Sequence, residues 1–234
     1  SCAWIESSEW DGRYALCVLG DIAVYEKGPA RPTGGCGALA ILVGPNSCLP
    51  LETGLRSSHV IDCYDFYKPH HSEYAAVDGK LSQWAYLSSV DTCYTRYKEK
   101  YYKKFSEHGN KIGLSHFDYF GFHTPYNKLT QKGFGRMIFQ DLRDGFSTAP
   151  EENAVLTQFL QEDLSNTYES RELEGALKPM IAPLFNEKVM PSCKINQNVG
   201  NCYTASVYSS LLSLVNDQGS ALENKRVLLF SYGS

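Results

Sequence analysis

Two apolar runs near the start of the chain place the strongest limit on what it can fold into. Arg13 to Tyr25 reads RYALCVLGDIAVY and is almost continuously apolar, as expected of a strand that is covered on both faces. Thr33 to Gly44 reads TGGCGALAILVG, a glycine-rich turn that leads into a second buried strand. We therefore expect a sheet whose faces are covered by other elements.

Helical and strand patterns alternate along the rest of the chain, which predicts an α/β fold. The expected helices are Ser82–Phe105, Leu129–Leu142, Glu151–Leu164, Arg171–Phe185 and Cys202–Val215. The expected strands are Ser115–His123, Val189–Asn196 and Val227–Phe230. No repeat or linker divides residues 1–234, so we treat them as one domain or part of one. The start resembles the tail of a helix and the end a strand that would continue, so we expect an internal piece of a longer protein.

Composition excludes several classes of protein. The 234 residues are 43% hydrophobic and 21% charged, which is typical of a globular chain rather than a disordered one. No apolar run is long enough to cross a bilayer, so we expect no membrane partner. The net charge of -4 argues against a nucleic-acid partner, and any site for an anion must be local.

The eight cysteines show no metal or redox pattern. No two are spaced as CxxC, and their spacings match no zinc site. We therefore expect reduced, buried cysteines in an intracellular protein and no bound metal.

One stretch, FHTPYNKLTQKGFGR, combines a histidine with a row of cations. His123 ends an apolar strand, and Lys128, Lys132 and Arg136 follow at helical spacing i, i+4 and i+8. This arrangement suits an anionic substrate, such as a phosphate-bearing carrier, whose reacting group reaches the imidazole. From this stretch alone, a solvated basic face with a structural histidine is the simpler interpretation.

Further polar residues lie at the ends of predicted elements, where α/β folds commonly build ligand sites. Asp65 in YDFYKP lies among aromatics, where a carboxylate needs a partner. Ser82 in DGKLS and Asn201 in VGNCY precede helices, and each has a helix cap as its alternative role. Thr33 lies in the turn ARPTGG, and Ser234 ends SYGS after the last strand.

Taken together, the motifs resemble those of the hydroxymethylglutaryl-CoA synthase family of the eukaryotic type. The resemblance runs from residue 1 to residue 234, in the family's order, through WIESSEWDGRYALCVLGDIAVY, ARPTGGCGALAILVGPN, YDFYKP, FHTPYNKL, VGNCYTASVYSSL and FSYGS. It implies a thiolase-like layered fold (αβαβα), here without its N-terminal part. Residues 1–234 would then hold the end of the N-terminal half and most of the C-terminal half.

The resemblance also implies an activity. The family condenses acetyl-CoA with acetoacetyl-CoA and water to hydroxymethylglutaryl-CoA and CoA, for sterol and isoprenoid or ketone-body synthesis. It works as a homodimer, uses no metal or redox cofactor, and acts in the cytosol, our default, or in mitochondria. In the family, the cysteine nucleophile and the glutamate base lie in motifs upstream of the point that matches residue 1. None of the eight cysteines here matches the nucleophile. We therefore expect residues 1–234 alone to be inactive.

Several residues match the family's functional positions. His123 matches the catalytic histidine, and Asp65 an acidic residue linked to the active site. The matches to CoA- and acyl-binding positions are Thr33, Ser82, Lys128, Lys132, Asn201 and Ser234. The departures are Pro29, where the family has a CoA-contacting asparagine, and Gly133 and Gly135 inside the lysine-bearing helix.

Three interpretations stay open at this point. The chain is a piece of a working synthase, a catalytically dead fragment that binds CoA or a second protomer, or another thiolase-like condensing enzyme. The motifs ARPTGG, YDFYKP and FHTPY argue against the third.

Overall fold

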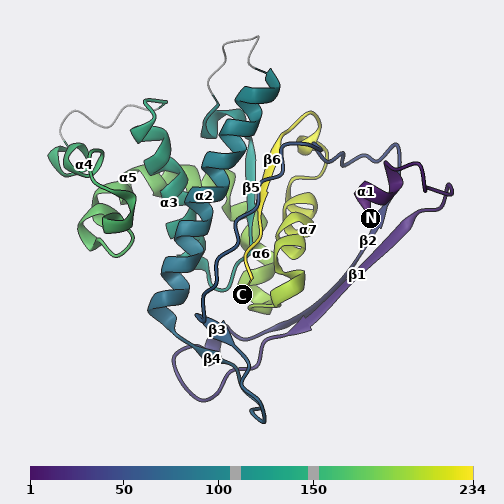
Figure 1. The fold of residues 1–234 in the computed structure, drawn as a ribbon, viewed down its shortest axis with the longest axis horizontal. Coiled ribbons are helices and arrows are strands. Elements are labelled where there is room, and N and C mark those ends of the chain that lie inside the picture. The colour runs from purple at the N-terminus through teal and green to yellow at the C-terminus, as the bar shows by residue number, and fades with distance from the viewer. Residues whose placement is uncertain (106–111, 147–152, 234) are drawn as a thin grey trace.

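Two short parallel strands form the centre of the fold, with helices packed on both of their faces (Figure 1). The computed structural model describes residues 1–105, 112–146 and 153–233. β5 (Tyr119–Phe122) pairs with β6 (Val227–Phe230), with Tyr119 opposite Val227. Two helices cover each side: α2 (Gly79–Phe105) and α3 (Asn127–Arg143) on one, α6 (Met190–Val199) and α7 (Ser206–Gln218) on the other. The α/β class predicted from the sequence is confirmed.

Aromatic side chains fill the space between the central strands and the helices α2 and α3. Phe120 and Phe122 of β5 are buried, and the ring centroid of Phe120 lies 5.1 Å from that of Phe134 on α3. Gly133 lets α3 approach α2 closely, because a Cβ atom added there would lie 3.0 Å from a ring carbon of Tyr86. This glycine, which costs stability in an isolated helix, is therefore a packing position.

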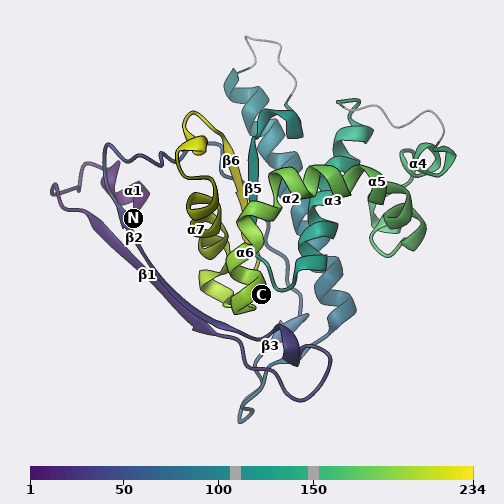
Figure 2. The ribbon, with the colours of Figure 1, turned by 180° about the vertical axis from the view of Figure 1, so that it is seen from behind.

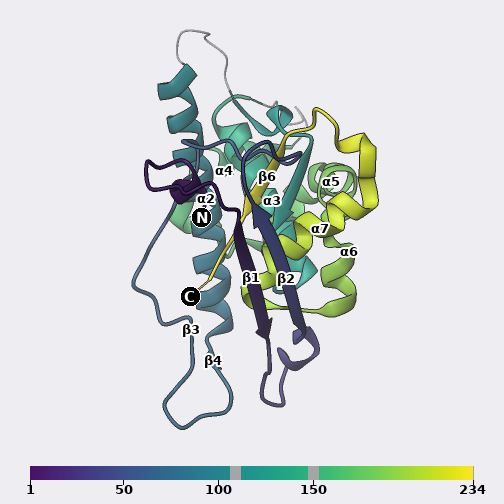
Figure 3. The same ribbon diagram turned by 90° about the vertical axis from the view of Figure 1, so that its right-hand side faces the viewer.

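A long antiparallel hairpin lies along one side of the molecule (Figure 3). It consists of β1 (Ala15–Ile22) and β2 (Cys36–Val43), and the short helix α1 (Cys2–Ile5) precedes it. Burial alternates along both strands, and the exposed positions are all apolar: Leu16, Val18, Gly20, Ile22, Cys36, Ala38, Ala40 and Leu42. The prediction that Arg13–Tyr25 is covered on both faces is wrong for this structure. Only the inner face of the hairpin is packed: β1 contacts the short turn of helix at Tyr203–Ala205, and β2 contacts that turn and α7.

An extended segment, residues 49–62, contains no helix or strand and runs along α2. Side chains of α2 spaced one turn apart donate to its main-chain carbonyls: Arg96 to Ser58, Lys100 to Arg56 at 2.5 Å and Lys104 to Thr53 at 3.3 Å. We call these three contacts the carbonyl ladder. The segment leads into two short paired strands, β3 (Phe66–Tyr67) and β4 (Ala76–Val77).

Residues 153–199 are mostly helical and contain α4 (Ala154–Phe159), α5 (Arg171–Lys188) and α6. Two of these helices, α5 and α6, pass in front of α3 and β5 in the view of Figure 2. The predicted strand at Val189–Asn196 is wrong. Pro191 is in the first turn of α6, where its missing N–H is not needed, and Cys193 and Asn196 are buried at helical spacing.

Short 3₁₀ turns connect these elements: η1 (Arg31–Thr33), η3 (Leu114–His116), η4 (Leu164–Thr167), η5 (Tyr203–Ala205) and η6 (Gly219–Leu222). All eight cysteines are free, as predicted. The prediction that they are buried holds only for Cys193 and Cys202. Two of the others are exposed and the rest are partly buried: Cys36 and Cys48 are exposed, and Cys2, Cys17, Cys63 and Cys93 are intermediate. Among the helices in the described ranges, none is long and apolar enough to cross a membrane.

Candidate functional site

A cavity of about 2800 Å³ is lined by residues of the hairpin, the extended segment and the helical body. It exceeds the roughly 300–1,000 Å³ of common small-molecule pockets, so it has room for a long ligand. Five of the residues predicted from the sequence line it, and they come from well-separated segments: Thr33, Asp65, Ser82, His123 and Asn201. The fold therefore brings together side chains up to 168 residues apart in the sequence.

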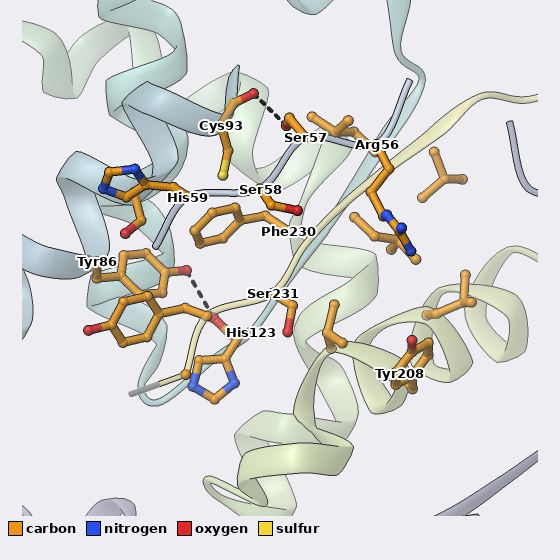
Figure 4. Close-up of a pocket in the computed structure, with 18 of the residues that line it drawn as sticks. Arg56, Ser57, Ser58, His59, Tyr86, Cys93, His123, Tyr208, Phe230 and Ser231 are labelled. Atoms are coloured by element: carbon orange, nitrogen blue, oxygen red, sulfur yellow. Dashed lines mark hydrogen bonds between the residues drawn. The ribbon is translucent and has the colours of Figure 1, made fainter. Parts of the chain in front are cut away.

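His123 follows the last residue of β5 and is held by its main chain (Figure 4). Its N–H donates to the Phe230 carbonyl at 2.7 Å, and its own carbonyl accepts from the Tyr86 hydroxyl at 2.9 Å. The side chain is only 6% exposed, and burial lowers the pKa of His123 to about 4. At neutral pH the ring is therefore uncharged and acts as a hydrogen-bond donor and acceptor.

Asp65 lies directly before β3 and is 1% exposed. Its Oδ2 accepts from the Tyr232 hydroxyl at 2.6 Å, whereas its Oδ1 is buried without a hydrogen-bond partner in the described part of the chain. The Tyr232 ring lies 6.4 Å from the His123 ring, centroid to centroid. Tyr232 therefore lies beside both the carboxylate and the histidine, and one carboxylate oxygen is left buried without a hydrogen bond among the described residues.

Thr33 and Asn201 meet where η1 approaches the end of α6. The Asn201 N–H donates to the Thr33 carbonyl at 2.8 Å, while the Thr33 hydroxyl donates to the Ala30 carbonyl. The Asn201 side chain donates to the Tyr25 hydroxyl at 3.0 Å and accepts from the Tyr203 N–H at 3.0 Å. The N-cap of the helical turn that follows is Cys202 rather than Asn201, and the hydrogen bonds of the Asn201 side chain to Tyr25 and to the Tyr203 N–H fix the orientation of its amide at the cavity wall.

Ser82 lies in the first turn of α2 and lines the cavity. The alternative that it caps this helix is wrong, because Asp78 does so. The Asp78 carboxylate accepts from the N–H groups of Lys80 and Leu81 at 3.1 and 3.0 Å. The Ser82 hydroxyl is therefore not needed as a cap.

The three cations that were predicted to share one face of α3 have different surroundings in the structure. Lys128 is exposed, and Lys132 is partly buried beside Glu174. Arg136 is 5% exposed and faces the interior, where its Nε donates to Asp91 at 2.9 Å. The prediction of a shared anion-binding face is therefore wrong for Arg136. Both lysines lie outside the cavity lining, although Gln83, which accepts from Lys132, belongs to it.

Eight tyrosines line the cavity and were not predicted, and four of them lie beside the residues described above: Tyr25, Tyr86, Tyr203 and Tyr232. Burial, followed by the hydrogen bond to Tyr25, raises the pKa of Tyr203. Tyr203 also has a φ of 39°, in the left-handed region, which is uncommon for a bulky residue. The sequence did contain a clue, because Tyr25, Tyr203 and Tyr232 lie within motifs that were already noted for other residues.

Two remaining predictions concern residues of a different kind. Ser234 lies outside the described residues. Pro29 lines the cavity, where it offers neither a side-chain amide nor a main-chain N–H. Within residues 1–105, 112–146 and 153–233, no group of three or more His, Cys, Asp or Glu side chains is placed to hold a metal ion.

Comparison with known sequences gives one consistent result. The family model described as hydroxymethylglutaryl-coenzyme A synthase C terminal matches residues 49–234, and the corresponding N-terminal model matches residues 1–48. Hydroxymethylglutaryl-CoA synthase A of Dictyostelium discoideum is 47% identical over 99% of this chain and 47% of its own length. The cytoplasmic human synthase is 45% identical and the mitochondrial synthase of Sus scrofa 44%, each over 99% of this chain. The chain spans about half the length of these relatives.

Solved structures give the same result for the fold. MvaS in complex with 3-hydroxy-3-methylglutaryl coenzyme A matches 99% of this chain and 52% of its own, with a TM-score of 0.78 and 27% identity. An HMG-CoA synthase complexed with CoA matches 88% of this chain and 42% of its own, with a TM-score of 0.58 and 25% identity. The predicted thiolase-like fold is therefore confirmed by the likeness to these synthases.

Proposed function

Because the chain belongs to the hydroxymethylglutaryl-CoA synthase family, we propose that it builds part of a site that condenses acetyl-CoA with acetoacetyl-CoA and water. The products are hydroxymethylglutaryl-CoA and free CoA. The observation that carries the proposal is the convergence of His123, Asp65, Thr33, Ser82 and Asn201 on one large cavity.

The proposed reaction begins on a cysteine that lies outside residues 1–234. Its thiolate attacks acetyl-CoA, the C–S bond to CoA breaks, and an acetyl thioester forms on the enzyme. A glutamate, also outside these residues, removes a methyl proton from that acetyl group. The resulting enolate forms a C–C bond with the ketone carbon of acetoacetyl-CoA, and the alkoxide formed from the ketone oxygen takes up the proton held by the glutamate. Water then hydrolyses the enzyme thioester, which releases the product and restores the cysteine.

The residues of this chain act on the second substrate. The neutral His123 ring donates a hydrogen bond to the ketone oxygen and stabilises the negative charge that develops there. The Asn201 amide, fixed by Tyr25 and Tyr203, orients the acyl group. Thr33 and Ser82 contact CoA from the cavity wall, and Ser234 is assigned to the acyl group. The proposal includes no metal or organic cofactor, because the CoA thioesters carry the reacting groups.

The lysines of α3 bind the phosphates of CoA at the rim of the cavity. Lys128 is exposed, so its ammonium group is accessible to an anion. Lys132 lies one helical turn further along α3 and reaches the cavity wall through Gln83. A charge-assisted hydrogen bond contributes about 1.5–3 kcal/mol, so replacing either lysine by alanine should weaken CoA binding by about 10- to 150-fold.

The proposal is tested in the whole protein that contains these 234 residues. His123→Ala should lower the condensation rate by about 10²- to 10³-fold, as expected when a charge-stabilising donor is lost. Acetylation of the cysteine by radiolabelled acetyl-CoA should change little, because His123 acts after that step. The exposed His70, replaced in the same way, serves as the control. Normal condensation by His123→Ala would overturn the assignment, and no acetylation in the wild type would identify a catalytically dead protein.

The cellular compartment and the oligomeric state of the whole protein are proposed separately, and each can be measured. Relatives include a cytoplasmic and a mitochondrial form, and we place this activity in the cytosol as part of isoprenoid and sterol synthesis. Cell fractionation tests that assignment. We also propose a homodimer for the whole protein, which analytical ultracentrifugation would detect as twice the protomer mass.

A further inference from the structure

Lys132 is not a free cation, because two side chains from other helices already contact its ammonium group. Glu174 Oε1 of α5 lies 2.6 Å from the Lys132 Nζ atom. Gln83 Oε1 of α2 accepts from the same nitrogen at 3.3 Å. The side chains of Lys132 and Glu174 are 21% and 38% exposed, so solvent and ions reach the pair. An anion that binds Lys132 must therefore compete with a carboxylate.

The position of Glu174 is set by the packing of α5 against α3. Glu174 lies in the first turn of α5, whose N-cap Ser170 accepts from the Leu173 N–H at 3.1 Å. Further along, α5 approaches α3 so closely that a Cβ atom on Gly135 would lie 2.5 Å from Ile181 Cδ1. Leu173 and Leu177 are buried on the same helix. Glu174 is thus carried by an anchored helix rather than by a mobile loop.

The other charges near Lys132 do not offset this carboxylate. Arg136, one turn further along α3, is neutralised by its buried contact with Asp91. Lys128, one turn back, has no ion pair among the described residues. The charge of Glu174 also reaches the cavity wall, because it adds to burial in raising the pKa of Tyr126. Lys128 is therefore open to a phosphate at once, whereas Lys132 must first be released.

We propose that Glu174 is the counter-ion that a CoA phosphate displaces from Lys132, so that this glutamate determines how tightly the site binds CoA. The proposal rests on the proposed function, in which Lys132 binds phosphate. Partly exposed ion pairs are worth about 0.2–1 kcal/mol, so removal of the carboxylate should tighten CoA binding by up to about fivefold at low salt. The gain should shrink as salt rises, because exposed charges are screened.

The experiment is a calorimetric titration of CoA into the whole protein at low and high salt. The variants are Glu174→Gln, Lys132→Ala and the double variant. Glu174→Ala is measured in parallel, because a glutamine oxygen could still accept from Lys132. The matched control is Glu172→Gln, which removes one exposed carboxylate from the same helical turn. We expect tighter binding for both Glu174 variants, no change for the control, and no gain from Glu174→Gln once Lys132 is absent.

The possible failures are distinguishable. If Lys132→Ala leaves CoA affinity unchanged, the proposed phosphate site itself is wrong. If Lys132→Ala weakens binding but neither Glu174 variant tightens it, the counter-ion proposal is overturned while the phosphate site stands. A gain that persists in the double variant would show a long-range charge effect and would also overturn the proposal.

Discussion

At the scale of single residues, the main feature is a histidine that is buried without a charged partner. Only desolvation shifts its pKa, which falls to about 4. Between pH 6.5 and 4 the unfolded chain binds a proton at this position that the folded chain does not bind. The free energy of unfolding therefore falls as the pH is lowered through that window, and it is unaffected by His123 above the window.

This pH dependence predicts a stability difference for His123→Gln. Between pH 7.5 and pH 5 the wild type should lose about 2 kcal/mol through His123, and the variant should lack this loss. Urea unfolding at the two pH values measures it, with the exposed His70→Gln as the control. An unchanged pH dependence in His123→Gln would show that the ring is protonated, or accessible to protons, in the folded state.

At the scale of elements, α3 shows what can and cannot be predicted from sequence. Its periodicity predicts a helix over Leu129–Leu142, and the structure confirms the helix with slightly wider bounds, Asn127–Arg143. Its neighbours do not follow, because Asp91 and Glu174 lie about 40 residues away in opposite directions along the chain. Without them Arg136 and Lys132 look like equivalent surface cations. In the structure Arg136 faces the interior and pairs with Asp91, whereas the ammonium group of Lys132 pairs with Glu174 near the surface.

Replacement by alanine should have opposite effects on stability at two helical glycines, one with free space around it and one in close contact with a neighbouring helix. Gly175 in α5 has nothing within 4 Å of an added Cβ atom, so Gly175→Ala should stabilise the protein by about 0.5–1 kcal/mol. Gly133→Ala should destabilise it by about 1–3 kcal/mol, because Tyr86 is fully buried and hydrogen-bonded and cannot move aside. Chemical denaturation of both variants measures the difference. Stabilisation by Gly133→Ala would show that α2 and α3 separate easily.

The buried ion pair between α2 and α3 predicts a second pattern. Removal of one partner, as in Arg136→Leu, leaves the Asp91 carboxylate buried without its cation and should cost about 3–5 kcal/mol. The double variant Arg136→Leu with Asp91→Leu should recover part of that loss. Equal destabilisation by the single and double variants, measured by denaturation, would mean that the pair contributes through shape rather than charge.

At the scale of the whole molecule, the cavity is the feature that sequence analysis could only partly predict. Thr33, Asp65, Ser82, His123 and Asn201 were identified from motifs, and the structure places them on one cavity. The tyrosines that orient them were not identified, because a hydroxyl group that fixes a neighbour leaves no spacing pattern. The covered hairpin was also mispredicted, since an apolar run does not reveal how many of its faces are packed.

The exposed face of the hairpin should govern the behaviour of this chain in solution. Val18 is 69% exposed on that face, so Val18→Lys should leave the free energy of unfolding within about 0.5 kcal/mol of wild type. It should also reduce binding of an apolar dye and light scattering, because it breaks up the apolar patch. Leu19→Lys, on the inner face, should instead destabilise the protein. Unchanged dye binding in Val18→Lys would show that the dye binds in the cavity.

The carbonyl ladder requires the extended segment and α2 to advance by equal distances between successive hydrogen bonds. One helical turn advances α2 by about 6 Å for every four residues, whereas two extended residues advance a chain by about 6.6 Å. The step from Arg56 to Ser58 therefore matches one turn of the helix. The step from Thr53 to Arg56 is one residue too long, and the turn at Gly54, with φ 88°, shortens it. The spacing of the carbonyls along the segment thus matches the spacing of the donors along α2. A residue inserted between Arg56 and Ser58 would shift the carbonyls relative to the donors and break at least one of these hydrogen bonds.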